Sequence, residues 1–239
     1  MDISLFYEAR GAGFPLILLH GNGECHDYFE YQIEYFSKFY RVIAPDTRGH
    51  GQSPRGGDDF SIRRFSEDLH DFMLELGIHH AHLLGFSDGG NIALEFILKH
   101  PEMVETLILN GANLNPGCVY RRVQLPIEIG FRIAGLFAKR SDKARANAEM
   151  LGLMVNEPQI APEALRALNM PVLVIAGTRD MIRRSHTKLI ARSLPHAELA
   201  ILSGSHFVAH ENPNVFNRTV EAFLHAHAPQ FAQDEEMHE

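Results

Sequence analysis

Short apolar runs alternate with amphipathic stretches along most of the chain. Continuous apolar runs, bounded by Gly, Pro or charged residues, predict strands at residues 3–9, 16–20, 82–84, 104–110, 171–176 and 197–202. Apolar residues that return every three or four positions predict helices at residues 26–39, 61–76, 91–98, 185–193 and 214–226. Alternation of this kind is typical of an α/β fold with a mostly parallel central sheet and helices on both faces.

Residues 113–169 break the alternation. They predict helices at 119–138, 141–155 and 162–168, and we interpret them as a short helical cap inserted into one core made of residues 1–112 and 170–227. We expect most of an apolar patch in the first cap helix to pack against the body, with part of it lining a substrate pocket; the patch comprises Ile127, Ile129, Phe131, Ile133, Leu136 and Phe137. Residues 228–239 are predicted to be a flexible tail.

The candidate chemistry begins at Ser87, which has Gly85 and Gly89 two residues to either side. A serine in this pattern, between a strand and a helix, is typical of a nucleophile elbow. The tight turn exposes the hydroxyl at the end of the strand and requires neighbours without a β-carbon. The following helix directs its N-terminal amides towards the place where an oxyanion would form. The sequence therefore predicts Ser87 as a nucleophile.

Two later strand ends supply an acid and a base. Asp180 follows the predicted strand at 171–176, and His206 follows the one at 197–202. Each has an ordinary alternative, because Asp often caps a helix and the chain holds 15 His residues. However, the carboxyl ends of parallel strands open onto one edge of the sheet, so the three side chains would converge there. Their order, Ser then acid then His, favours catalysis.

Three segments resemble the α/β-hydrolase fold superfamily: HGNG at residues 20–23, DTRGHGQS at 46–53 and GSHFVAHENP at 204–213. The resemblance covers nearly the whole chain. It implies a catalytic triad of Ser87, His206 and Asp180. We expect no cofactor and no metal. It also implies an oxyanion hole built from the backbone N–H groups of Asn22 and Asp88.

Asp88 is the candidate for substrate specificity. The S-D-G-G sequence at residues 87–90 resembles the biphenyl-hydrolase-like branch, whose members include hydrolases of α-amino-acid esters. By this resemblance Asp88 would pair with a substrate ammonium group. The alternative is an acidic residue that complements the helix dipole. Phe207, beside the candidate base, is a further candidate substrate contact.

The identity of the nucleophile narrows the function. The superfamily's epoxide hydrolases and haloalkane dehalogenases use Asp at this position, so Ser87 argues against both. We predict a serine hydrolase that cleaves small to medium carboxylic esters through an acyl-enzyme. The alternatives are hydrolysis of α-amino-acid esters, hydrolysis of a C–C bond on the same triad, and a ligand receptor of the same fold with little turnover.

Composition and net charge limit the classes of molecule that the protein is expected to bind. A net charge of −8 argues against nucleic acid or an anionic membrane as a general partner. The predicted hydrolase activity makes a small-molecule ester the expected partner. Cys25 and Cys118 form no disulfide framework, and His225 and His227 lack further ligands at metal-site spacing. No apolar stretch reaches membrane length, and the first residues lack a signal pattern, so we expect a cytoplasmic monomer or homodimer.

The predicted cap differs in charge from the rest of the chain. It carries eight basic and five acidic residues, a net charge of +3, which leaves −11 for the rest of the chain. This asymmetry would help a lid rest on the acidic body or steer anionic substrates; solvated helix faces explain it equally well.

Overall fold

The computed structural model describes residues 2–57 and 59–227. Seven strands form one sheet in the order β1-β3-β2-β4-β5-β6-β7. β1 runs antiparallel to β3, and the other five neighbouring pairs are parallel. The strands are β1 (Tyr7–Arg10), β2 (Pro15–Leu19), β3 (Arg41–Pro45), β4 (Ala81–Phe86), β5 (Val104–Asn110), β6 (Val172–Gly177) and β7 (Ala197–Leu202).

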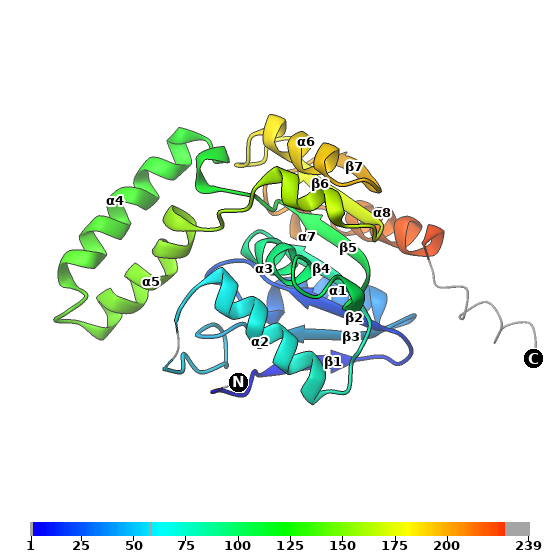
Figure 1. Cartoon of the computed structure of the whole chain (residues 1–239), viewed down its shortest axis with the longest axis horizontal. Helices are drawn as coiled ribbons and strands as arrows, with labels where there is room; N and C mark the ends of the chain where they lie inside the picture. Colours follow the sequence, from blue (N-terminus) through cyan, green and yellow to red (C-terminus); the bar gives the residue numbers. More distant parts are fainter. Residues whose placement is uncertain (1, 58, 228–239) are drawn as a thin grey trace, which may run out of the picture.

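Helices cover both faces of this sheet (Figure 1). The α-helices are α1 (Glu30–Phe36), α2 (Ile62–Glu75), α3 (Asp88–Ile97), α4 (Arg121–Phe137), α5 (Asp142–Asn156), α6 (Arg184–Ser193), α7 (Val208–Glu211) and α8 (Pro213–Ala226). The 3-10 helices are η1 (His26–Phe29), η2 (Pro101–Met103), η3 (Pro116–Cys118) and η4 (Pro162–Ala167). The predicted α/β fold class is confirmed. Among the described residues, no helix is both long and apolar enough to span a membrane.

Two hydrophobic clusters fill the space between the sheet and its helices. Ile17 and Leu19 of β2 belong to the cluster under α2, α3 and α6, whereas Leu16 and Leu18 belong to the one under α1 and α8. Successive strand residues point to opposite faces, so a strand covered on both faces reads as a continuous apolar run. This explains why the sequence shows runs rather than alternation at the central strands.

Two predicted elements differ from the structure near the N-terminus. The first strand begins at Tyr7 rather than at residue 3, because the backbone of Phe6 bonds to a loop: its N–H donates to Ser53 Oγ (2.8 Å) and its carbonyl accepts from Asp46 N (2.8 Å). The single helix predicted at 26–39 is the 3-10 helix η1 followed by α1. The Asp46 carboxylate holds the start of η1 by accepting from the His26 N–H (2.8 Å).

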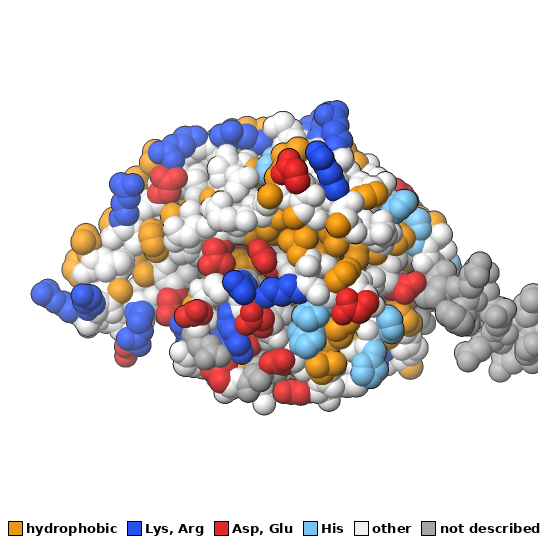
Figure 2. Space-filling view, in the orientation of Figure 1, with side chains coloured by type: hydrophobic (Ala, Val, Ile, Leu, Met, Phe, Trp, Pro, Cys, Tyr) orange, Lys and Arg blue, Asp and Glu red, His pale blue; other side chains and the backbone are white. Residues whose placement is uncertain are grey.

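Helices α4 and α5 form a hairpin that projects from the body, and we call residues 121–156 the arm (Figure 1). Leu151 lies against Gly130, and Phe131 lies against Gly152, so the two helices pack on each other. The expectation that the α4 patch packs mostly on the body is wrong, because Ile133 is 53% and Leu136 77% exposed. Lys and Arg side chains lie along the arm (Figure 2). The third predicted helix of this region, at 162–168, is the 3-10 helix η4.

Candidate active site

Ser87 occupies the turn between β4 and α3. Its backbone has φ 52° and ψ −117°, and it is the only residue other than glycine with a positive φ in the described part of the chain. A β-carbon at Gly89 would overlap the Leu19 carbonyl oxygen, which explains the glycine there. The Ser87 N–H donates to the Asn110 carbonyl (2.8 Å), which fixes the turn to the end of β5. This geometry matches the predicted elbow.

The structure brings the three residues predicted from the strand ends together. His206 Nε2 lies 3.0 Å from Ser87 Oγ, and His206 Nδ1 lies 2.7 Å from Asp180 Oδ1. His206 and Asp180 are 4% and 6% exposed, and Ser87 is partly exposed. The Ile182 N–H donates to Asp180 Oδ1 (2.9 Å), which orients the carboxylate. A base placed between a hydroxyl and a buried carboxylate can accept the hydroxyl proton.

A glycine after β5 leaves room for the base. Gly111 has a φ of 65°, and a β-carbon there would lie 2.6 Å from His206 Cε1. Any other residue at this position would be strained and would displace the His206 ring.

His20 supports the loop after β2 that holds Asn22. Its Nε2 accepts from the Thr47 N–H (2.9 Å), so its Nδ1 carries the proton and donates to the Gly21 carbonyl (2.8 Å). Burial lowers the pKa of His20 to about 4, so the ring is neutral near pH 7. The imidazole thereby ties this loop to the segment after β3.

Asn22 and Asp88, the residues predicted to form the oxyanion hole, contact each other through their side chains. Asn22 Nδ2 donates to Asp88 Oδ2 (3.0 Å), and Asn91 Nδ2 donates to Asp88 Oδ1 (3.0 Å). Burial raises the pKa of the Asp88 carboxyl, which is 8% exposed. Because both oxygens already accept from amides, recognition of an ammonium group by Asp88 stays a prediction. Phe207, 46% exposed, has its ring centroid 5.6 Å from that of His206.

Sequence reasoning missed several polar groups near the elbow. Asn91 Nδ2 also donates to Asn113 Oδ1 (3.0 Å), and the Asn113 N–H donates to Asn91 Oδ1 (2.9 Å). Asn22 Nδ2 also donates to the Met150 carbonyl of α5 (2.8 Å). Their sequence separations, from 22 to 128 positions, leave no local pattern that could have predicted the contacts.

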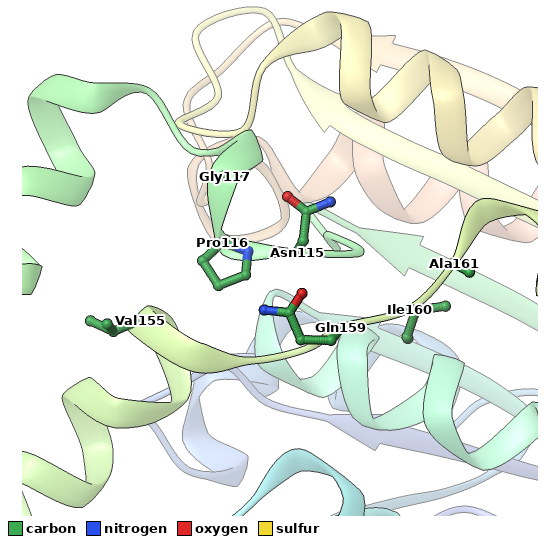
Figure 3. A pocket seen from close by; sticks show the side chains of 7 residues that line it. All are labelled: Asn115, Pro116, Gly117, Val155, Gln159, Ile160 and Ala161. Carbon is green, nitrogen blue, oxygen red and sulfur yellow. The ribbon is translucent and has the colours of Figure 1, made fainter.

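Two pockets lie at the arm. One pocket has a volume of about 530 Å³ and lies between residues 115–117 and residues 155–161 (Figure 3). These two segments join the arm to the body. Another, of about 390 Å³, lies between α5 and the loop before α2, where Phe60, Glu149 and Met150 line it. The second pocket is lined by Met150, whose carbonyl accepts a hydrogen bond from Asn22 of the oxyanion loop.

One side-chain cluster has metal-ligand chemistry. The ligand atoms of Cys25, His26 and Asp46 lie within 4.8 Å of one another. However, Asp46 Oδ1 already accepts from the His26 N–H, and Asp46 Oδ2 accepts from the Gln52 N–H (2.8 Å each). Burial also raises the pKa of the Cys25 thiol, which disfavours the thiolate that binds metals. Hydrogen bonds between the segment after β3 and the start of η1 thus account for this cluster.

Comparison with known proteins places this geometry in a family. A family model described as the α/β-hydrolase fold matches residues 15–131. The chain is 29% identical to 2-hydroxymuconate semialdehyde hydrolase of Pseudomonas putida, covering 90% of this chain and 88% of that protein. It is 28% identical to 3-oxoadipate enol-lactonase 2 of Acinetobacter baylyi, covering 93% and 94%. The solved structure of a meta-cleavage product hydrolase from Pseudomonas fluorescens superposes with a TM-score of 0.77 at 26% identity, covering 94% and 95%. The chain is therefore a member of the α/β-hydrolase fold superfamily.

Proposed function

We propose that the chain is a serine hydrolase of small to medium carboxylic esters, with Ser87 as nucleophile. The observation that carries the proposal is the pair of hydrogen-bond distances, 3.0 and 2.7 Å, that link Ser87, His206 and Asp180 in series. Few structural roles require a strained serine, a buried imidazole and a buried carboxylate in this order.

The mechanism follows from this arrangement. His206 Nε2 takes the proton of Ser87 Oγ as the oxygen attacks the ester carbonyl, and then returns it to the leaving alcohol. Asp180 holds the ring with its proton on Nδ1 and stabilises the imidazolium. Water, deprotonated by His206, then hydrolyses the acyl-enzyme.

The oxyanion would be stabilised by the backbone N–H groups of Asn22 and Asp88. Asp88 is the first residue of α3, and the first N–H groups of a helix have no acceptor within that helix. Each such donor is worth about 3 kcal/mol of barrier.

The relatives are hydrolases, but they cleave different types of bond. A lactone is a cyclic ester, so the enol-lactonase relative supports ester cleavage. The semialdehyde hydrolase and the meta-cleavage product hydrolase favour C–C bond hydrolysis as the second candidate. A receptor with little turnover remains the candidate from another class, and it predicts tight ligand binding without Ser87-dependent product.

The experiment is hydrolysis of p-nitrophenyl esters of graded acyl length, with an aminoacyl ester and a meta-cleavage product included. We expect turnover of the esters that falls at least about a thousandfold in Ser87→Ala. Ser66→Ala, which removes a buried hydroxyl from α2, is the matched control and should retain activity. Ester turnover that survives in Ser87→Ala would overturn the proposal, and turnover of the meta-cleavage product alone would select the C–C hydrolase.

A further inference from the structure

A continuous chain of hydrogen bonds runs from the arm through the nucleophile elbow. It starts at the Met150 carbonyl of α5, passes through the side chains of Asn22, Asp88 and Asn91, and ends at Asn113. The donor–acceptor distances along it are 2.8, 3.0, 3.0 and 3.0 Å. Asn91 is fully buried, and Asp88 and Asn113 are each 8% exposed. Asn22 and Met150 are half-buried, so the hydrogen bonds are buried at the Asn91 end and partly exposed at the arm. The buried hydrogen bonds hold their groups in one arrangement.

This chain of hydrogen bonds links the two residues whose backbone N–H groups would stabilise the oxyanion. Asn22 lies in the loop after β2, and Asp88 begins α3, so 66 positions separate them in sequence. Nothing in the covalent backbone fixes the distance between their N–H groups. The hydrogen bond between Asn22 Nδ2 and Asp88 Oδ2 supplies such a restraint, because it joins the side chains of the same two residues.

Resting on the proposed function, we propose that Asn22 and Asp88 are positioning residues whose side chains set the oxyanion hole, and that α5 holds Asn22 in place through the Met150 carbonyl. The arm is then part of the catalytic machinery through a backbone atom rather than through a side chain that touches substrate. The position of α5 thereby controls how well the two amides are aligned.

The order of donors and acceptors along these hydrogen bonds requires a carboxylate at position 88. Asn91 Oδ1 accepts from the Asn113 N–H, so its Nδ2 must face Asp88. Asn22 also directs its Nδ2 towards Asp88, since the same nitrogen donates to the Met150 carbonyl. Two donors therefore meet at residue 88, and only a group with two acceptor oxygens satisfies both. An amide at this position has one acceptor oxygen and must leave one donor unpaired.

This role differs from recognition of a substrate ammonium group. A carboxylate that binds the substrate would matter for aminoacyl esters and little for neutral ones. A carboxylate that positions the oxyanion hole matters equally for both, because every ester forms the same oxyanion. The two roles are therefore separated by one substitution, Asp88→Asn, which preserves shape and removes one acceptor.

The experiment measures kcat and KM of wild type, Asn22→Ala and Asp88→Asn on p-nitrophenyl acetate and on an aminoacyl p-nitrophenyl ester. It also measures inhibition by phenylboronic acid, whose tetrahedral adduct with Ser87 places an oxygen in the oxyanion hole. The matched controls are Asn214→Ala and Glu75→Gln, which replace exposed residues of α8 and α2, away from the arm. Thermal unfolding is recorded for every variant.

We expect kcat to fall about tenfold in both variants, with KM within about twofold and the same loss on both esters. The inhibition constant of phenylboronic acid should rise by a similar factor, while the controls stay near wild type. A loss confined to the aminoacyl ester, a rise in KM at unchanged kcat, or unchanged boronic acid inhibition would overturn the inference. If wild-type turnover depends on Ser87 but not on Asn22 or Asp88, this inference fails alone; if turnover does not depend on Ser87, the proposed function fails with it.

Discussion

At the scale of single residues, Glu24 shows how the site raises the pKa of a carboxyl group. Its Oε2 accepts from the Gly21 N–H (3.2 Å), in the loop that holds Asn22. Burial is the main cause that raises the pKa of Glu24 to about 7, against the lowering effects of this hydrogen bond and of His206. A carboxyl group next to the candidate oxyanion hole is therefore half neutral near pH 7.

We predict that Glu24→Gln stabilises the protein at about pH 8 and not at about pH 5. The unfolded chain ionises Glu24 near its ordinary pKa of 4.5, whereas the folded protein does so near 7. As the pH rises through this window, ionisation favours the unfolded state, and Gln removes that cost while it can still accept from Gly21. A melting temperature about 2–4 °C above wild type at the higher pH is the expected result, measured by calorimetry. Equal shifts at both pH values would contradict the pKa assignment.

At the scale of elements, Arg48 connects the segment after β3 to helix α2. The guanidinium is fully buried and makes two bonds to Asp68: Nε to Oδ2 (2.6 Å) and Nη2 to Oδ1 (2.7 Å). Within the same segment, Ser53 Oγ donates to the Asp46 carbonyl (2.6 Å). Residues 46–53, which resemble a family motif in sequence, thus act here by bracing the loop rather than by contacting the reacting groups.

Asp68→Ala should destabilise the fold by about 3 kcal/mol, because it removes two hydrogen bonds from the buried Arg48 guanidinium and leaves Asp2 as its remaining carboxylate partner. Chemical denaturation measures the change. Glu75→Ala, which removes an exposed carboxylate from the same helix, should change the free energy of unfolding by less than about 0.5 kcal/mol. Similar effects of the two substitutions would show that the buried pair does not carry this stability.

The elements differ in how well the sequence predicts them. The central strands and α2 follow directly from buried runs and helical spacing, because local pattern and tertiary burial agree there. The apolar patch of α4 misled the prediction, since Ile133 and Leu136 are largely exposed rather than packed on the body. Apolar spacing shows that a helix has an apolar face but does not say what covers it.

At the scale of the whole molecule, long-range contacts decide what the sequence could predict of the site. Ser87, Asp180 and His206 could be predicted because each follows a strand, and the sheet brings the strand ends to one edge. The contacts between arm and body could not: Asn22 binds Met150 across 128 positions, and Arg55 Nε binds Glu149 Oε2 (2.9 Å) across 94. Such pairs depend on how α5 lies over the body, which no local pattern encodes.

A fluorophosphonate traps an activated serine as a covalent adduct, so mass spectrometry of the protein after this reaction shows whether Ser87 is the nucleophile. We predict a single adduct on the peptide that contains Ser87, formed at least about a hundredfold more slowly in His206→Ala because the hydroxyl loses its base. No adduct, an adduct on another residue, or labelling at the same rate without His206 would contradict the claim that this chain is a serine hydrolase acting through Ser87.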